Sequence, residues 1–409
     1  MNLTVSTLCA CALATSALGA SITTLGLGRA ESISDNGSVV AGMNGNTMWV
    51  WTAGGGLASV PASNPITAVI SGNGNVLAGV TADENNNFRQ CHQPFPLTGA
   101  GWQFVPYVVD GTCADSWISS SVAVSGDGSV LAGAMPNAGC VGVDVATTWS
   151  VADGVQEWYS PYGSVSRIDG ISADGRTMFG GHYTEIEGSG MHHGCIWYAD
   201  GTFEPISMTV FHGALSAMNR AGTIFAGNWD PATGNAYTWT AAGGFRDLGA
   251  IDGMEFVFNK RPTSMTDDGS VVIGVAGDFW SMSPVIWIDG QGGQPLKTYL
   301  QNLGVSGIDD YYFQSAAAIT PDGRYIVGDY MLDDGTFNTY AYLVDLQGEG
   351  GPVCPADFNQ DGGVDGADVE AFYAAWENSL PDADVNQDGG VDGGDVETFF
   401  AAWEAGGCA

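Results

Sequence analysis

Two short acidic segments near the end of the chain carry the side chains best suited to hold a metal ion. The first contains Asp357, Asn359, Asp361, Gly363, Asp365 and Asp368, and the second, 27 residues later, contains Asp384, Asn386, Asp388, Gly390, Asp392 and Asp395. Oxygen ligands recur at loop positions 1, 3, 5, 9 and 12, with a backbone carbonyl at position 7 and a glycine at position 6 for the sharp bend. Calcium takes about six to eight oxygens at this spacing. The sequence therefore predicts two calcium ions.

An apolar pattern follows each acidic segment and argues against a disordered acidic tail. Val369, Phe372, Tyr373 and Trp376 recur as Val396, Phe399, Phe400 and Trp403. This spacing places the apolar side chains on one face of a short helix. From Cys354 to the end the chain has 13 acidic residues and no Lys or Arg. We therefore expect two helices that pack together once metal neutralises the loops.

Residues 354–408 resemble a dockerin module. Position 12 of each loop is Asp rather than the Glu usual in EF-hands, and Cys354 and Cys408 bracket the segment as in the cysteine-bracketed dockerins of planctomycete-like bacteria. The resemblance implies two calcium ions and docking onto a cohesin-like receptor. The positions that read the partner in cellulosomal dockerins are Gly366-Ala367 and Gly393-Gly394 in this chain, without hydroxyl or bulky groups. The identity of the receptor therefore stays open.

A seven-fold repeat precedes this module. Each copy has a turn dipeptide, three mostly apolar residues and a glycine: Asn36-Gly37 to Gly42, Asn73-Gly74 to Gly79, Asp127-Gly128 to Gly133, Asp174-Gly175 to Gly180, Ala221-Gly222 to Gly227, Asp268-Gly269 to Gly274 and Asp322-Gly323 to Gly328. The steps between copies are 37, 54, 47, 47, 47 and 54 residues. A period of this size suits a four-stranded blade, so we expect an all-β, seven-bladed β-propeller over residues 21–346, followed by a small α domain at 354–409. We also expect positive φ at both residues of each Asn-Gly or Asp-Gly turn.

The strands around each turn can be placed from their composition. A strand of small residues precedes the turn and fits the crowded innermost position, as in Ala316-Ala317-Ala318-Ile319. A third strand carries a tryptophan in five copies, at Trp51, Trp149, Trp197, Trp239 and Trp287. Phe95 is the nearest candidate in the second copy, and Tyr342-Leu343 in the seventh. One tryptophan per blade at a fixed phase favours a core between blades over a sugar-stacking surface.

The start of the repeat region indicates how the ring closes. Ile22-Thr23-Thr24-Leu25-Gly26 reads as a fourth strand ahead of the first turn, and the seventh copy lacks room for its own. The N-terminal strand can therefore complete the last blade, which removes exposed sheet edges. Through runs such as Ala236 to Gly274, residues 22–346 resemble the HAF-type extracellular repeat proteins of bacteria. That resemblance implies a secreted propeller-like domain and no particular reaction.

Composition limits the partners and the compartment. The chain has 10 Lys and Arg against 45 Asp and Glu, for a net charge of −35, which argues against nucleic acid or an anionic membrane as partner. Residues 1–20 read as a secretory signal peptide with cleavage after Leu18-Gly19-Ala20, and no other run approaches a membrane span. We expect a secreted protein in which residues 347–353 form a flexible linker.

Six cysteines remain after the signal peptide, an even number that suggests disulfides in an exported protein. Cys354 and Cys408 are expected to pair. The other four allow three arrangements, of which we favour Cys91–Cys113 with Cys140–Cys195.

Three candidate sites remain in the propeller. His182, His192 and His193, with Glu185 and Glu187, form either a zinc or copper site or a solvated loop. His182, Tyr183, Trp229, Trp280 and Tyr330 form either a sugar platform or a hydrophobic rim. Acidic pairs for glycosidic chemistry cannot be recognised without coordinates.

No catalytic motif of the common hydrolase, nucleotide-binding or metalloprotease types occurs in the sequence. We therefore favour a non-catalytic, secreted binding or scaffold protein, with extracellular carbohydrate as a possible ligand. The alternative is a carbohydrate-active enzyme, a polysaccharide hydrolase or lyase of an extracellular assembly, because dockerins commonly deliver such enzymes.

Overall fold

The computed structural model describes most of the repeat region and the two C-terminal helices. The described residues are 20–97, 99, 101–106, 122–136, 144–161, 165–186, 189–206, 215–228, 235–254, 259–278, 281–332, 336–347, 356, 358, 366–378, 383, 385 and 391–404. The expected signal peptide, apart from Ala20, and the expected Cys354–Cys408 pair lie outside these residues.

The repeat region forms seven antiparallel sheets of four strands, each a blade. Blades 1 to 3 consist of β2 (Arg29–Ile33), β3 (Val39–Asn44), β4 (Thr47–Thr52) and β5 (Gly56–Val60); β6 (Thr67–Ile70), β7 (Val76–Ala82), β8 (Phe88–Pro94) and β9 (Gln103–Phe104); and β10 (Val122–Val124), β11 (Val130–Pro136), β12 (Asp144–Ser150) and β13 (Gly154–Trp158). Blades 4 and 5 consist of β14 (Val165–Ile171), β15 (Thr177–Ile186), β16 (Ser189–Tyr198) and β17 (Phe203–Pro205); and β18 (Leu215–Met218), β19 (Phe225–Gly227), β20 (Tyr237–Thr240) and β21 (Gly244–Asp247). Blades 6 and 7 consist of β22 (Asn259–Met265), β23 (Val271–Gly277), β24 (Met282–Ile288) and β25 (Gly292–Pro295); and β26 (Tyr311–Ile319), β27 (Tyr325–Leu332), β28 (Thr339–Asp345) and β1 (Ser21–Leu27).

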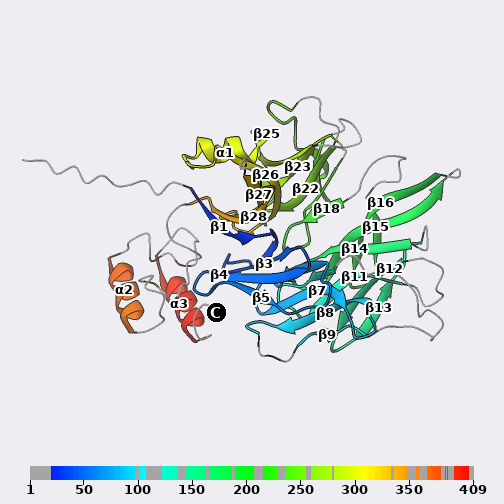
Figure 1. Cartoon of the computed structure of the whole chain (residues 1–409), viewed down its shortest axis with the longest axis horizontal. Coiled ribbons are helices and arrows are strands. Elements are labelled where there is room, and N and C mark those ends of the chain that lie inside the picture. Colours follow the sequence, from blue (N-terminus) through cyan, green and yellow to red (C-terminus); the bar gives the residue numbers. More distant parts are fainter. Residues whose placement is uncertain are drawn as a thin grey trace, which may run out of the picture.

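The blades close into a ring, which confirms the predicted seven-bladed propeller (Figure 1). The first strand of each blade is innermost and contacts its neighbours around the ring, from β2 and β6 through to β22 and β26. The ring is complete because β26 also contacts β2. The predicted N-terminal clasp is confirmed as well. Strand β1 pairs antiparallel with β28, with Ser21 opposite Asp345 and Leu27 opposite Tyr340.

The turn between the first and second strands differs from the predicted geometry. In blade 1 the Gly37 N–H donates to the Ser34 carbonyl at 2.9 Å, and Gly37 has φ of 76°. Asn36 and the other turn Asn and Asp residues are not among the described residues with positive φ. The expectation of positive φ at both turn residues was therefore wrong. Asn36 serves through its side chain instead, because its Oδ1 accepts from the Ser38 N–H and from the Ser34 hydroxyl.

A buried hydroxyl fastens this turn in six of the seven blades. It donates to the turn Asn or Asp and accepts the N–H of the residue that begins or precedes the second strand. The hydroxyls belong to Ser34, Ser71, Ser125, Ser172, Thr266 and Thr320. In blade 5 the Asn219 Oδ1 accepts from Thr223 and Ile224 N–H at 2.8 and 2.9 Å, which explains why Ala221 can stand where other blades have Asn or Asp.

The repeat glycine marks a close approach between the first and second strands. At Gly274 an added Cβ would collide with the Arg261 carbonyl, and at Gly328 it would collide with the Ser315 carbonyl. The first strand is bulged opposite or next to this point in blades 1, 4, 5, 6 and 7. A bulge leaves one residue unpaired and re-aims its side chain. The repeat therefore places one extra residue of these first strands toward the axis of the ring.

The five tryptophans form the core between blades, as predicted. Trp197 and Trp287 are almost fully buried, and Trp287 packs in one cluster with Ala217 and Ala226 of blade 5. In register each tryptophan lies opposite the residue two before the repeat glycine. The same register position holds Gln93 in blade 2 and Val344 in blade 7, rather than Phe95 or Tyr342-Leu343.

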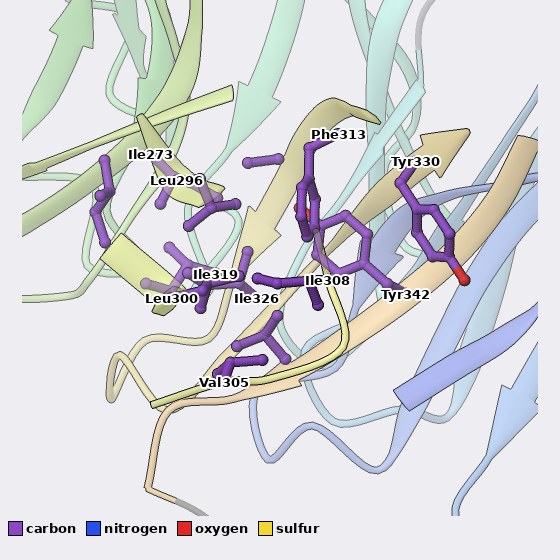
Figure 2. Packing of buried hydrophobic residues seen from close by; sticks show 13 residues of the cluster. Ile273, Leu296, Leu300, Val305, Ile308, Phe313, Ile319, Ile326, Tyr330 and Tyr342 are labelled. Atoms are coloured by element: carbon purple, nitrogen blue, oxygen red, sulfur yellow. The ribbon is translucent and has the colours of Figure 1, made fainter. Parts of the chain in front are cut away.

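A helix that the sequence analysis did not predict accounts for the long last step of the repeat. Helix α1 (Leu296–Asn302) follows β25 and leads into blade 7. Its Leu296 and Leu300 side chains are fully buried in a cluster with Ile273 of blade 6 and Ile326 of blade 7 (Figure 2). The insertion therefore widens the spacing between copies while it seals the junction of two blades. Among the described residues, no helix has the length and apolar character needed to cross a membrane.

The favoured disulfides Cys91–Cys113 and Cys140–Cys195 were wrong, because Cys91 and Cys195 are free thiols in the core. Each lies on a third strand directly opposite a repeat glycine, Gly79 or Gly180, and its sulfur lies 3.5 or 3.7 Å from that glycine's carbonyl. Burial raises the pKa of both thiols. Both thiols are therefore part of the buried core of their blades.

The hydroxyl at the turn should contribute measurably to stability. Thr320→Val keeps the side-chain volume but leaves the buried Tyr325 N–H without its acceptor, which lies 2.9 Å away. We expect a loss of about 1–3 kcal/mol in the free energy of unfolding, measured by urea denaturation. Thr23→Val, at an exposed position of β1, is the control and should change stability little. Equal midpoints for the two variants would show that the hydroxyl does not fasten the turn.

Candidate functional site

A narrow channel runs along the axis of the ring and receives residues from all seven innermost strands or the turns that follow them. Its cavity has a volume of about 290 Å³. The residues at the bulges help to line it, among them Glu31, Asp169, Ser216, Thr263 and Ala317. The lining is therefore mixed, with carboxylates in blades 1 and 4 and small or hydroxyl side chains elsewhere.

One end of the channel, which we call the turn face, carries the hairpins that join first and second strands. Backbone hydrogen bonds link neighbouring hairpins there, for example from Asp35 to Gly72 and from Ala173 to Arg220, both at 2.8 Å. Arg220 of blade 5 also donates from Nη2 to Asp35 Oδ2 of blade 1 at 2.7 Å. Burial raises the pKa of the Asp35 carboxyl, and nearby Asp267 raises it further while Arg220 opposes this. Arg220 therefore supplies positive charge where acidic turns converge.

The opposite end, which we call the crossover face, is where the chain passes from one blade to the next. Arginines lie near the start of the innermost strands of three blades there, at Arg29, Arg167 and Arg261. All three hold the same register position, and their carbonyls are the ones that approach the repeat glycines. The sequence analysis missed these residues. The available signal was that few basic residues exist, and that Arg29, Arg167 and Arg261 recur at one phase of the repeat, seven residues before the turn Asn or Asp.

Two of these arginines are held in a fixed orientation by the residue two positions later. Arg29 donates from Nε to Glu31 Oε1 at 2.9 Å, and Arg167 donates from Nε to Asp169 Oδ2 at 3.2 Å. Their side chains remain 58% and 56% exposed. A guanidinium bound through Nε keeps its two terminal nitrogens for another partner. The crossover face therefore presents oriented cations in a chain that is strongly acidic.

The predicted histidine site is only partly described. His182 and His193 are directly opposite each other on β15 and β16, with ring centroids 5.4 Å apart, and both are buried. Because both rings are buried, His182 and His193 do not belong to a solvated loop, which was the alternative prediction. No group of three or more His, Cys, Asp or Glu side chains arranged for a metal occurs among the described residues. The side chains of His192 and Glu185, and all of Glu187, lie outside the description.

The predicted sugar platform does not form from the described residues. Tyr330 is 2% exposed and stacks on Tyr311 with ring centroids 3.9 Å apart, and its hydroxyl lies 2.7 Å from the Thr24 hydroxyl. His182 is buried as well. Both residues therefore serve as core, while Trp229, Trp280 and the Tyr183 side chain lie outside the described part of the chain.

The C-terminal helices appear as predicted. Helices α2 (Gly366–Glu377) and α3 (Gly393–Glu404) pack through Phe372 and Phe399, whose rings are parallel and 4.3 Å apart. The indole N–H of Trp376 donates to the Asp392 carbonyl at 2.7 Å and so joins the first helix to the second loop. The two copies of the duplication therefore form one small core.

Three of the predicted calcium ligands lie among the described residues. Asp368 and Asp395, at position 12 of their loops, are fully buried in the first turns of α2 and α3. Asp395 Oδ2 accepts the Asp392 N–H at 2.8 Å, and Asp392 Oδ1 accepts the Gly394 N–H at 2.8 Å, a reciprocal cap of α3. The other predicted ligands, Asp357, Asn359, Asp361, Gly363, Asp365, Asp384, Asn386, Asp388 and Gly390, lie outside the described residues.

The two buried carboxylates fit a cation. Burying a carboxylate is costly unless positive charge compensates it. The stretch that contains Asp368 and Asp395 has no Lys or Arg from Cys354 onward. A hard divalent cation with oxygen ligands would supply a compensating positive charge.

Solved structures share the fold at low sequence identity, whereas no family model and no curated protein matches the sequence. The β-propeller domain of the Trilobed protease from Pyrococcus furiosus aligns with a TM-score of 0.52 and 13% identity, over 80% of this chain and 95% of that one. The putative TolB from Agrobacterium tumefaciens aligns with a TM-score of 0.41 and 13% identity, over 79% and 96%. TolB from Acinetobacter baumannii aligns with a TM-score of 0.38 and 14% identity over 55% of this chain, which spans about half, 53%, of that protein.

The first of these likenesses shows the β-propeller fold and carries no activity with it. The Pyrococcus domain is described as having an open velcro topology. In the present chain the N-terminal strand β1 instead pairs with β28 and completes the last blade.

The buried histidine pair should make the propeller sensitive to acid. Burial, together with the adjacent His193 ring, lowers the pKa of the His182 imidazole from 6.5 to about 4. Because the unfolded state binds the proton more readily, the stability that neutral His182 provides is complete above about pH 6.5 and falls as the pH drops toward 4. Urea denaturation of the wild type and His182→Leu across this window should show a steeper loss for the wild type. Identical slopes would contradict the assignment.

Proposed function

We propose that the protein is a secreted, non-catalytic binding or scaffold protein with two modules. Residues 21–346, a propeller of HAF-type repeats, bind a ligand outside the cell. Residues 354–409, a dockerin-like module, hold two calcium ions and dock onto a cohesin-like receptor. Residues 1–20 direct export, and residues 347–353 connect the modules.

The observation that carries this proposal is the symmetric placement of Asp368 and Asp395. Each lies in the first turn of a helix, at the last position of an acidic loop, and each is fully buried. The helices pack through Phe372 and Phe399. Bound calcium would neutralise both carboxylates and hold the loops against their own repulsion. A helix pair formed in this way gives a receptor a surface that exists only with the metal.

Calcium titration of the full chain tests the module. Isothermal titration calorimetry should give two calcium ions per chain for the wild type. Asp368→Asn and Asp395→Asn should each remove one site, because each deletes one charged ligand from one loop. Glu370→Gln is the matched control, since it removes the same charge from an exposed position of α2 and should keep both sites. Two intact sites in the double variant would contradict the proposal.

Docking is tested by capture on an immobilised cohesin-like receptor. Capture should require calcium and should be lost with a chelator, because the paired helices depend on the metal. Capture that is unchanged by the chelator would contradict calcium-dependent docking.

The non-catalytic role of the propeller is tested by incubation with a panel of polysaccharides. The channel lining contains three carboxylates, Glu31, Asp35 and Asp169, and each accepts a hydrogen bond from an arginine of the propeller. We expect no product. Product release that Glu31→Gln or Asp169→Asn abolishes would favour the alternative, a polysaccharide hydrolase or lyase.

A further inference from the structure

A pocket of about 440 Å³ lies where the ring closes, on the crossover face. Three segments form it: the link Leu27-Gly28-Arg29 between β1 and β2, the hairpin Met43-Asn44-Gly45 between β3 and β4, and Phe337-Asn338-Thr339 before β28. The Gly28 N–H donates to the Thr339 carbonyl at 2.8 Å and holds the first and third segments together. The pocket therefore exists only because the N-terminal strand completes the last blade.

Phe337 contributes an apolar ring that the fold itself does not use. Its side chain is 82% exposed, and its backbone has φ of 55°, in the left-handed region. For a bulky residue this conformation is an outlier and carries strain. Burial of the ring does not offset that strain. Residues kept in such conformations cluster at functional sites, which points to contact with a ligand.

Arg29 contributes an oriented cation in the same pocket. Its Nε is bound to Glu31, and Glu31 Oε2 is in turn anchored by Thr67 Oγ1 at 3.0 Å and the Ala68 N–H at 2.9 Å of blade 2. Its terminal nitrogens have no acceptor among the described residues. Two parallel N–H groups of this kind match the two oxygens of a carboxylate.

The remaining polar groups suit hydroxyls. Asn44 and Asn338 are exposed, and each presents an amide that can both donate and accept. The net charge of −35 disfavours long polyanions such as nucleic acid, so the anion must be a single group on a largely neutral ligand.

From these features we propose that this pocket binds a uronic acid residue of an oligosaccharide. The carboxylate lies on Arg29, the C–H face of the sugar lies on the Phe337 ring, and the hydroxyls bind the two asparagine amides. The proposal deepens the proposed binding role of the propeller and does not depend on the calcium module.

Isothermal titration of the full chain tests the pocket with three ligands: a trimer that carries one uronic acid residue and is otherwise neutral, its methyl ester, and the neutral trimer of the corresponding sugars. The acid should bind, and the ester and neutral trimer should bind at least about tenfold more weakly because they lack the charge. Binding should persist in EDTA. Loss of binding in EDTA would overturn the proposal, because it would place the sugar on calcium rather than on Arg29.

Single substitutions distinguish a loss of ligand binding in this pocket from a loss of folding. Arg29→Gln should lower affinity for the acid trimer at least about tenfold. Arg167→Gln is the matched control, because Arg167 has the same register and the same Nε bond to an acid two residues later, and it should keep affinity within about twofold. Phe337→Gly should lower affinity about fivefold while the protein stays at least as stable, since glycine accepts the left-handed backbone.

Equal losses of affinity in the two arginine variants, or unchanged affinity in Phe337→Gly, would overturn the proposal that this pocket binds the sugar. Tight binding of the neutral trimer that neither variant weakens would place the ligand elsewhere on the propeller. In that case the proposed binding role would stand and this site would fall.

Discussion

The close approach of first and second strands at the repeat glycine is the constraint on which the propeller depends. At Gly274 and Gly328 the carbonyl of the innermost strand occupies the space where a side chain would begin. Strands that meet this closely can converge around one narrow axis, and the bulges beside them aim an extra residue at the channel. The contact that packs the ring therefore also decides which side chains line its centre.

The two ends of the ring differ in chemistry because they differ in connection. At the turn face, short hairpins bond to one another and the Arg220–Asp35 ion pair lies across the channel. At the crossover face, three of the innermost strands carry an arginine near their start, at Arg29, Arg167 and Arg261. Carboxylates two residues after the first two hold the guanidinium groups outward. Three guanidinium groups at one register position are thus placed at the end where the chain passes between blades and where β1 closes the ring.

Much of the fold and part of the site were predictable because they rest on local periodicity. The spacing from Asp268-Gly269 to Gly274, repeated seven times, is enough to give blade number and strand phase. The helical spacing of Phe372 and Phe399 gave the C-terminal helices, and their parallel rings confirm the packing. Helix α1 was missed because a seven-residue segment is too short for its periodicity to stand out beside a strand.

By itself the sequence determined how many blades there are, which strand closes them and where acidic loops precede helices, since neighbours along the chain suffice for each. Only the tertiary structure decided which side chains lie opposite one another and which are buried. It placed Cys91 opposite Gly79 as a buried thiol and turned Tyr330 into the core. It also brought Arg29 and Phe337 together across the closing junction. Residues about three hundred positions apart share a surface only through the curvature of the whole ring, and no local pattern records that curvature.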